Sequence, residues 1–262
     1  RKIMGVNFRP SVSMDRRMNC YCLYFPPIFA KHYVKLGISE KAKRELTSGV
    51  PDYISNNEDF QRIWLQGTLS EDGSLYPFVQ NTGGRLFISP VIQWNRNNKV
   101  DVNIKNHTKS DFYQKDIKLD VVRKLKSNIN PLIRDEARFL RNFNIEINPM
   151  FSRLHVSNKG TITAVYSVHI RGFRSCENWL SNISFELKRH KKQLNLLLGN
   201  HGSVSKSEVQ EILIKFYSLI PRYLRDKRKI LSNKWLEDEQ KIYLMGDSDG
   251  NTTADNSSCR AQ

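Results

Sequence analysis

The sequence predicts an α+β fold with the element order αββαββα between about residues 57 and 200. Two β-rich runs each fold back at a turn that contains Asn and Gly, which is typical of antiparallel hairpins. Segments with helical periodicity precede, separate and follow these hairpins. The chain has no Gly-rich phosphate loop and no βαβ alternation, so we expect an antiparallel sheet rather than a parallel one.

The first core helix is expected from about Asp59 to Asp72. Glu58 and Asp59 in its first turn complement the helix dipole, and Gly73 supplies the stop. The candidate N-terminal caps are Asn56 and Asn57.

The first hairpin is expected directly after Gly73, with its turn at residues 81–84. Pro77 and Pro90 cannot donate to a sheet ladder, so they predict edge or irregular pairing. After this hairpin, Ile117, Val121 and Leu125 recur every four residues and predict a helix. Pro131 is expected to restart that helix, since proline suits a first helical position.

The second hairpin is expected over residues 152–173, with its turn at 158–160. Its side chains alternate between two faces, as in a strand with one buried face. The apolar face contains Leu154, Val156, Ile162, Ala164, Tyr166, Val168 and Ile170. The polar face contains Arg153, His155, Ser157, Thr163, Ser167, His169 and Arg171.

Two further helices are expected within residues 176–198, and Ser205 to Glu208 form a capping-box pattern that opens another. The basic segment 222–230 and a polar tail follow. We therefore predict a basic N-terminal extension (1–50), a core domain (51–200), a helical basic C-terminal extension (201–245) and a disordered tail (246–262).

The charge of the chain favours a polyanionic partner. Lys and Arg number 42 against 26 Asp and Glu, which gives a formal net charge of +16. Nucleic acid is the commonest polyanion bound by such proteins. No apolar run reaches the roughly 20 residues of a membrane span, so no membrane partner is expected. The first residue is Arg1 and no signal-peptide pattern follows, so we expect a fragment or a processed chain in an intracellular location, cytoplasmic or organellar.

The four cysteines do not predict a metal–sulfur site. Cys20 and Cys22 are separated by one residue, and no second close pair follows. Zinc sites generally use two pairs with wider spacing. We expect reduced thiols.

The segment from Leu65 to Gly73, LQGTLSEDG, resembles the nonapeptide of the LAGLIDADG homing endonucleases. The element order αββαββα is also that of this family, and the resemblance covers about residues 50–200. It implies a sheet that forms a DNA-binding saddle. It also implies a site-specific double-strand DNA endonuclease that hydrolyses phosphodiesters.

The resemblance implies that Asp72 holds a divalent metal ion, Mg²⁺, with Glu71 as its neighbour in the site. A lone carboxylate is disfavoured at a helix C-terminus, where the dipole is negative. A cation shared with the counterpart acid of a second motif helix relieves that repulsion. Gly67 and Ser70 would form the narrow face where the two helices meet. The alternative is a solvated helix end without a metal.

Two further catalytic residues are implied by the resemblance. Gln93 lies where the family positions a water, with a surface Gln at a strand end as the alternative. A lysine after the second hairpin would stabilise phosphate charge. Lys188, Lys191 and Lys192 are candidates, and we favour Lys191; the alternative is a solvated helix face.

The motif departs from the family at three positions. Ser70 replaces an acid that is more often structural, and Gln66 and Thr68 are polar where the family has apolar residues. The loss of the acid at Ser70 does not remove catalysis, whereas the two polar residues raise the chance of an inactive or repurposed domain.

Base edges of duplex DNA would be read by the strands, and Lys and Arg would hold phosphates. The alternative is an ordinary solvated sheet face. The predicted DNA-binding residues are Tyr76, Gln80, Asn81, Arg85, Gln93, Arg153, His155, Ser157, Thr163, Ser167, His169 and Arg171. Basic residues of segment 222–230 are a further candidate for phosphate contact.

Three functions compete. The first is the endonuclease, which needs a homodimer or a second repeat upstream because one motif is visible. The second is a non-cleaving nucleic-acid-binding protein on the same fold, either a maturase that binds intron RNA or a transcription regulator. The third is an unrelated basic α+β protein associated with RNA or the ribosome.

Overall fold

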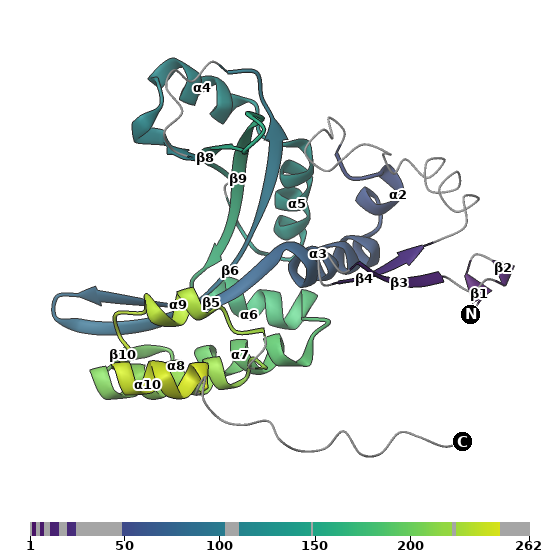
Figure 1. Cartoon of the computed structure of the whole chain (residues 1–262). Coiled ribbons are helices and arrows are strands. Elements are labelled where there is room, and N and C mark those ends of the chain that lie inside the picture. The colour runs from purple at the N-terminus through teal and green to yellow at the C-terminus, as the bar shows by residue number, and fades with distance from the viewer. Residues whose placement is uncertain are drawn as a thin grey trace. The chain divides into compact units, whose positions relative to one another are not determined.

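The computed structural model describes residues 49–102, 110–147, 149–221 and 224–246 and four short N-terminal strands (Figure 1). These strands are β1 (Lys2–Ile3), β2 (Val6–Asn7), β3 (Ser11–Asp15) and β4 (Cys20–Tyr24), paired as β1–β2 and β3–β4. The tail predicted to be disordered lies almost entirely outside the described residues.

Two compact units make up the chain. Unit 1 consists of Arg1–Gln61, Asn95–Phe139 and Asn148–Ser167. Unit 2 consists of Arg62–Trp94, Leu140–Ile147 and Val168–Gln262. These units combine segments that are distant in sequence, so they differ from the consecutive ranges expected from the sequence, which remain predictions.

Helix α3 (Glu58–Asp72) occupies the expected range, after the short helix α2 (Asp52–Ser55). The side chain of Asn57 caps it, because its Oδ1 accepts a hydrogen bond from the Phe60 amide at 3.1 Å. The cap is therefore Asn57, the second of the two candidates.

Strands β5 (Gly73–Thr82) and β6 (Arg85–Lys99) form the first hairpin. Its turn is Gly83-Gly84, whose φ values of 58° and 80° suit glycine. Pro77 lies opposite Pro90 in an unbroken register, so the predicted irregular pairing is not observed. The edge placement of β5 is confirmed, since β6 is its partner in the described sheet.

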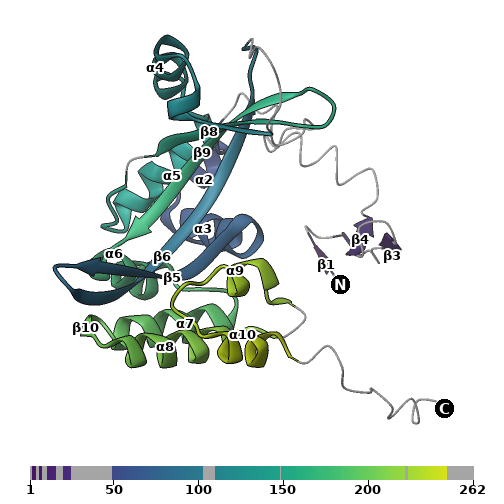
Figure 2. The same ribbon diagram turned by 60° about the vertical axis from the view of Figure 1, so that its left-hand side comes forward.

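The second hairpin consists of β8 (Met150–Val156) and β9 (Ile162–Arg171). The sheet order is β10-β6-β9-β8-β7, with β5 also on β6, and β6 and β9 lie side by side in both views (Figure 2). Their direction is antiparallel, because Asn95 meets Ser167 while Val100 meets Ile162. The predicted mixed fold of helices and antiparallel sheet is confirmed.

Strand β7 (Asp111–Tyr113) was not predicted. It pairs antiparallel with β8 and leads through the 3₁₀ turn η2 (Gln114–Asp116) into α4 (Leu119–Ser127). Helix α5 (Pro131–Asn142) restarts at the expected proline. Buried Asn130 caps it by accepting from the Leu132 amide at 2.9 Å.

The C-terminal half adds helices to unit 2. These are α6 (Phe173–Asn178), the π-helical turn η3 (Trp179–Ile183), α7 (Lys188–Gly199), α8 (Lys206–Ser218), α9 (Lys227–Leu231) and α10 (Asp238–Met245), with β10 (Gly202–Val204) between α7 and α8. The Ser205–Glu208 capping box is confirmed. No helix in the described ranges is both long and apolar enough to cross a membrane.

Candidate nucleic-acid interface

The junction between α3 and β5 positions Asp72. Asp72 is the last residue of α3 and is exposed, and Gly73 is already the first residue of β5. A Cβ atom at Gly73 would approach the backbone Cα and O of Leu69 to 2.7 Å, so only glycine fits without movement. The side chain of Glu71 lies outside the described part of the chain, and its predicted metal role stays a prediction.

Gln93 is held by a neighbour on the same strand face. Ser74 lies directly opposite Gln93, and Tyr76 lies diagonally across the strand pair. The Tyr76 hydroxyl donates to Gln93 Oε1 at 3.0 Å, which leaves the amide NH₂ of Gln93 available as a donor. Burial raises the pKa of Tyr76, while the nearby positive charge and hydrogen bond of Arg171 oppose that rise.

Arg171 joins this group from the end of β9. Its guanidinium carbon lies 5.7 Å from the centre of the Phe78 ring, a cation–π geometry. Its Nη2 lies 3.1 Å from His169 Nδ1. Burial and the charge of Arg171 lower the pKa of His169, so the neutral ring accepts this hydrogen bond. We call Tyr76, Phe78, Gln93, His169 and Arg171 the Arg171 cluster.

The remaining predicted residues of the first hairpin surround its turn and are exposed. Gln80 and Arg85 share the face of Tyr76, because Gln80 is two strand positions beyond Phe78 and Arg85 lies opposite Thr82. Asn81 is one position out of this alternation, so the register places it on the opposite face.

Arg153 and His155 are bound by an acid that the sequence analysis missed. Arg153 Nε donates to Asp111 Oδ1 at 2.9 Å, and His155 Nδ1 lies 3.1 Å from the same oxygen. Asp111 comes from β7, where it pairs with His155 in the register. We call Asp111, Arg153 and His155 the Asp111 cluster.

The hydroxyls predicted on the second hairpin are used within the protein. Ser167 is 3% exposed and donates to Asn95 Oδ1 at 2.7 Å. Thr163 is 8% exposed and donates to the His155 carbonyl, while Ser157 Oγ accepts from the Thr161 amide. The middle of β9 is buried on both faces, so the exposed polar face expected there is not observed.

The face of α3 predicted to contact a second helix is open at Gly67. A Cβ atom at that position would meet nothing within 4 Å. Ser70 lies one turn further along and is half-buried. The two polar departures from the motif belong to the interior: Gln66 Nε2 donates to the Ile183 carbonyl at the end of η3, and Thr68 is 6% exposed.

Lys191 and its two lysine neighbours, Lys188 and Lys192, are exposed on α7. Of the basic extension, Arg225 donates to the carbonyls of Ile220 and Leu244, so it braces the C-terminal helices rather than facing a ligand. The structure thus brings Tyr76, Gln93 and Arg171 together and leaves Lys191 on a helix surface.

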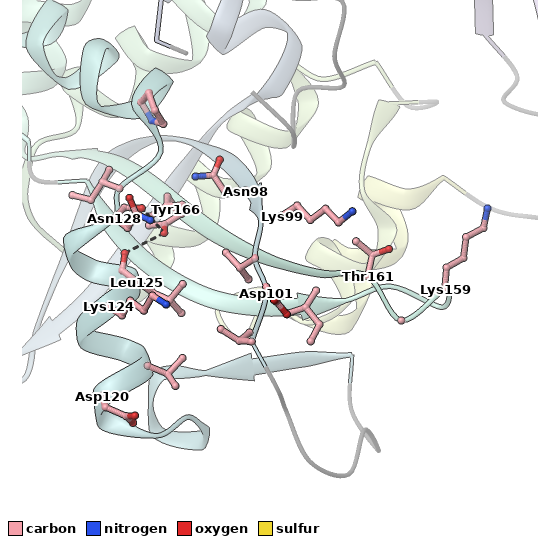
Figure 3. A pocket seen from close by; sticks show the side chains of 17 residues that line it. Asn98, Lys99, Asp101, Asp120, Lys124, Leu125, Asn128, Lys159, Thr161 and Tyr166 are labelled. Carbon is pink, nitrogen blue, oxygen red and sulfur yellow. Dashed lines mark hydrogen bonds between the residues drawn. The ribbon is translucent and has the colours of Figure 1, made fainter. Parts of the chain in front are cut away.

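Unit 1 also contains a cavity of about 1260 Å³ between the end of β6, α4 and the β8–β9 turn (Figure 3). The hydroxyl of Tyr166 bonds the carbonyls of Leu125 and Asn128 at its wall. Three lysines (99, 124 and 159) and two aspartates (101 and 120) line it, a net formal charge of +1. This near balance does not favour a polyanion there.

No protein-family profile and no curated protein matches this chain. Among solved structures, it is similar to the homing endonuclease I-CvuI in complex with the I-CreI target in the presence of 2 mM Mg. The similarity has 12% sequence identity and a TM-score of 0.28, and it covers 62% of this chain and 78% of that one. A TM-score of 0.28 is too low to establish a shared fold.

Proposed function

We propose that this chain is a site-specific double-strand DNA endonuclease of the LAGLIDADG type. One observation carries the proposal. Helix α3 ends at exposed Asp72 and passes without a loop into the hairpin that carries Gln93, and Arg171 of β9 lies over Phe78 of the same hairpin. A carboxylate that can hold a metal ion, an amide donor and a cation can each assist the hydrolysis of a phosphodiester.

The open face of α3 supports a two-helix arrangement. Ile63 is 61% exposed and lies four residues before Gly67, and Ser70 lies three residues after it. This spacing aligns the three residues along one side of the helix. The side chains at 67 and 70 are small, so a second motif helix from a homodimer partner or another repeat can approach closely.

The proposed roles follow from these positions. Asp72 and its counterpart acid would face the scissile phosphates. Gln93 would orient the attacking water through its amide NH₂, since its oxygen is already bonded to Tyr76. Arg171 would stabilise phosphate charge directly, and Lys191 would do so from α7.

The described part of the chain does not by itself provide a complete metal site. The described residues contain no group of three or more His, Cys, Asp or Glu side chains that could hold a metal ion. Asp72 is an exposed hard-oxygen ligand, which suits Mg²⁺. The remaining ligands would therefore come from the counterpart helix, DNA phosphate and water, and a bound ion would supply charge stabilisation at the phosphate.

The second candidate function is supported by the lack of such a ligand group among the described residues. A domain that has lost its metal ligands and keeps its basic charge would bind DNA or intron RNA without cutting it. The maturase and the transcription regulator belong to this class.

The test compares wild type with Asp72→Asn and Gly67→Leu on a randomised duplex library, with and without Mg²⁺. We expect wild type to self-associate and cut, Asp72→Asn to self-associate without cutting, and Gly67→Leu to remain folded but monomeric. Asp120→Asn, which removes another exposed helical acid, should cut like wild type. Salt-sensitive binding with no cleavage in any protein would overturn the endonuclease and leave the binding protein.

A further inference from the structure

The Asp111 cluster joins two strands that sequence spacing does not connect. Asp111 of β7 lies opposite His155 of β8, and Tyr113 lies opposite Arg153. One carboxylate oxygen, Asp111 Oδ1, is shared by Arg153 Nε at 2.9 Å and His155 Nδ1 at 3.1 Å. The carboxylate therefore fixes two neighbouring side chains on one face of β8.

This contact leaves the outer edge of the guanidinium available. Arg153 is bound through Nε, and among the described residues Nη1 and Nη2 have no hydrogen-bond partner. The side chain is 32% exposed. A planar fork with two parallel N–H groups matches the O6 and N7 acceptors of guanine in the major groove.

The shared carboxylate also changes what this surface can bind. Asp111 compensates the charge of Arg153, which weakens attraction to phosphate but leaves the N–H directions intact. Although burial opposes it, the hydrogen bonds from His155 and Arg153 lower the pKa of Asp111, so the carboxylate stays ionised at neutral pH. A neutralised, oriented arginine suits base recognition better than phosphate binding.

We infer that Asp111 is a positioning residue that holds Arg153 to read a guanine in the major groove of the target DNA. This inference rests on the proposed DNA-binding function. In a neutral ring this contact favours the Nδ1–H tautomer of His155, which leaves Nε2 as an acceptor. Two residues along an antiparallel strand span about 6.8 Å, close to two base-pair steps of about 3.4 Å. His155 would then meet a base roughly two steps from the guanine.

The experiment selects binding sites from a randomised duplex library with wild type, Asp111→Asn and Arg153→Lys. We expect wild type to prefer guanine at one position. Arg153→Lys should lose this preference roughly 10- to 100-fold, because lysine keeps the charge but lacks the fork. Asp111→Asn should weaken the preference while raising affinity for non-specific DNA, since it removes one negative charge.

Arg171→Ala serves as a matched control, and it should weaken binding to all sequences without shifting the preferred base. Thermal unfolding of each variant checks that the fold is kept. If Asp111→Asn unfolds, Arg153→Lys alone decides the outcome.

An unchanged guanine preference in Arg153→Lys would overturn the inference, as would an equal loss of affinity on all sequences. Such results with a site-selective wild type would leave the proposed function standing. A wild type that selects no site would instead overturn both. A guanine preference that depends on Arg153, without cleavage, would overturn only the endonuclease.

Discussion

Two arginines on the strands of this protein are held in opposite ways. Arg171 rests against the Phe78 ring and a neutral histidine, whereas Arg153 is bound to the carboxylate of Asp111. An aromatic ring orients a guanidinium without cancelling its charge. A carboxylate orients the guanidinium and also cancels its charge. Under the proposed function, the Arg171 cluster would therefore suit a charged ligand and the Asp111 cluster a polar one.

The two units also contain different buried interactions. Unit 1 contains a buried ion pair, in which Arg96 Nη2 lies 2.6 Å from Glu136 Oε1, and the two side chains are 8% and 0% exposed. Unit 2 contains a group of tilted aromatic rings, in which the ring centroid of Trp179 lies 5.9 Å from that of Trp94 and 6.1 Å from that of Phe185. A buried ion pair is sensitive to the loss of one partner, whereas ring packing tolerates conservative changes.

The largest effect is expected at the buried ion pair. Glu136→Gln should lower the free energy of unfolding by about 3–5 kcal/mol, because it leaves the charge of Arg96 buried and uncompensated. Urea unfolding monitored by circular dichroism measures this. The control Glu177→Gln, an exposed acid, should change stability by less than about 0.5 kcal/mol. Similar losses in the two variants would mean that unit 1 does not depend on the pair.

A smaller effect is expected where α3 meets β5, next to the Arg171 cluster. Gly73→Ala should cost about 1–3 kcal/mol, because the new Cβ meets the backbone of Leu69. Gly67→Ala should instead stabilise the monomer by up to about 1 kcal/mol, since it adds a helix-favouring residue in open space. Thermal unfolding of the two glycine variants measures both changes in stability. A destabilised Gly67→Ala would show that this face is already occupied.

The units should also differ in their response to acid. Burial and the adjacent Arg189 lower the pKa of His190 in unit 2 from 6.5 to about 4. Between these pH values the unfolded chain binds a proton that the folded chain does not, so stability falls as pH decreases from 6.5 to 4. Urea unfolding at several pH values should show this slope in wild type and a weaker one in His190→Leu.

The contribution of Asp111 in unit 1 to stability should change in a lower pH range. Its pKa in the folded protein is lowered from 3.8. Its contribution to stability is therefore complete above pH 3.8 and is lost as the pH falls through the folded-state pKa. Asp111→Asn should therefore match the pH slope of wild type between 6.5 and 4. A weaker slope in that range would contradict the assignment to His190.

The smallest expected effect is a difference between the two arginines in the salt dependence of DNA binding. Arg171→Ala should reduce the slope of log affinity against log salt by about 1, because one phosphate contact is lost. Arg153→Ala should change that slope less, since Asp111 already compensates its charge. Fluorescence titrations of labelled duplex at several salt concentrations measure both. Equal slopes would remove the distinction between the clusters.

Most of the element order could be predicted from the sequence because its signals are local. The caps at Asn57 and Ser205, the turn at Gly83-Gly84 and the restart at Pro131 each depend on residues a few positions apart. Periodicity within single strands and helices supplies the rest. The charge excess that favours nucleic acid is a property of composition alone.

The candidate site was predicted only in part, because its contacts join distant segments. Asp72 and Gln93 were implied by the family resemblance, but the Tyr76–Gln93 bond depends on register, and the contact of Arg171 with Phe78 joins β9 to β5. Asp111 was missed because β7 is three residues long and lies 42 positions from Arg153. Strand alternation predicts faces but not neighbours, so only the tertiary structure decided which cations are neutralised and which hydroxyls are buried.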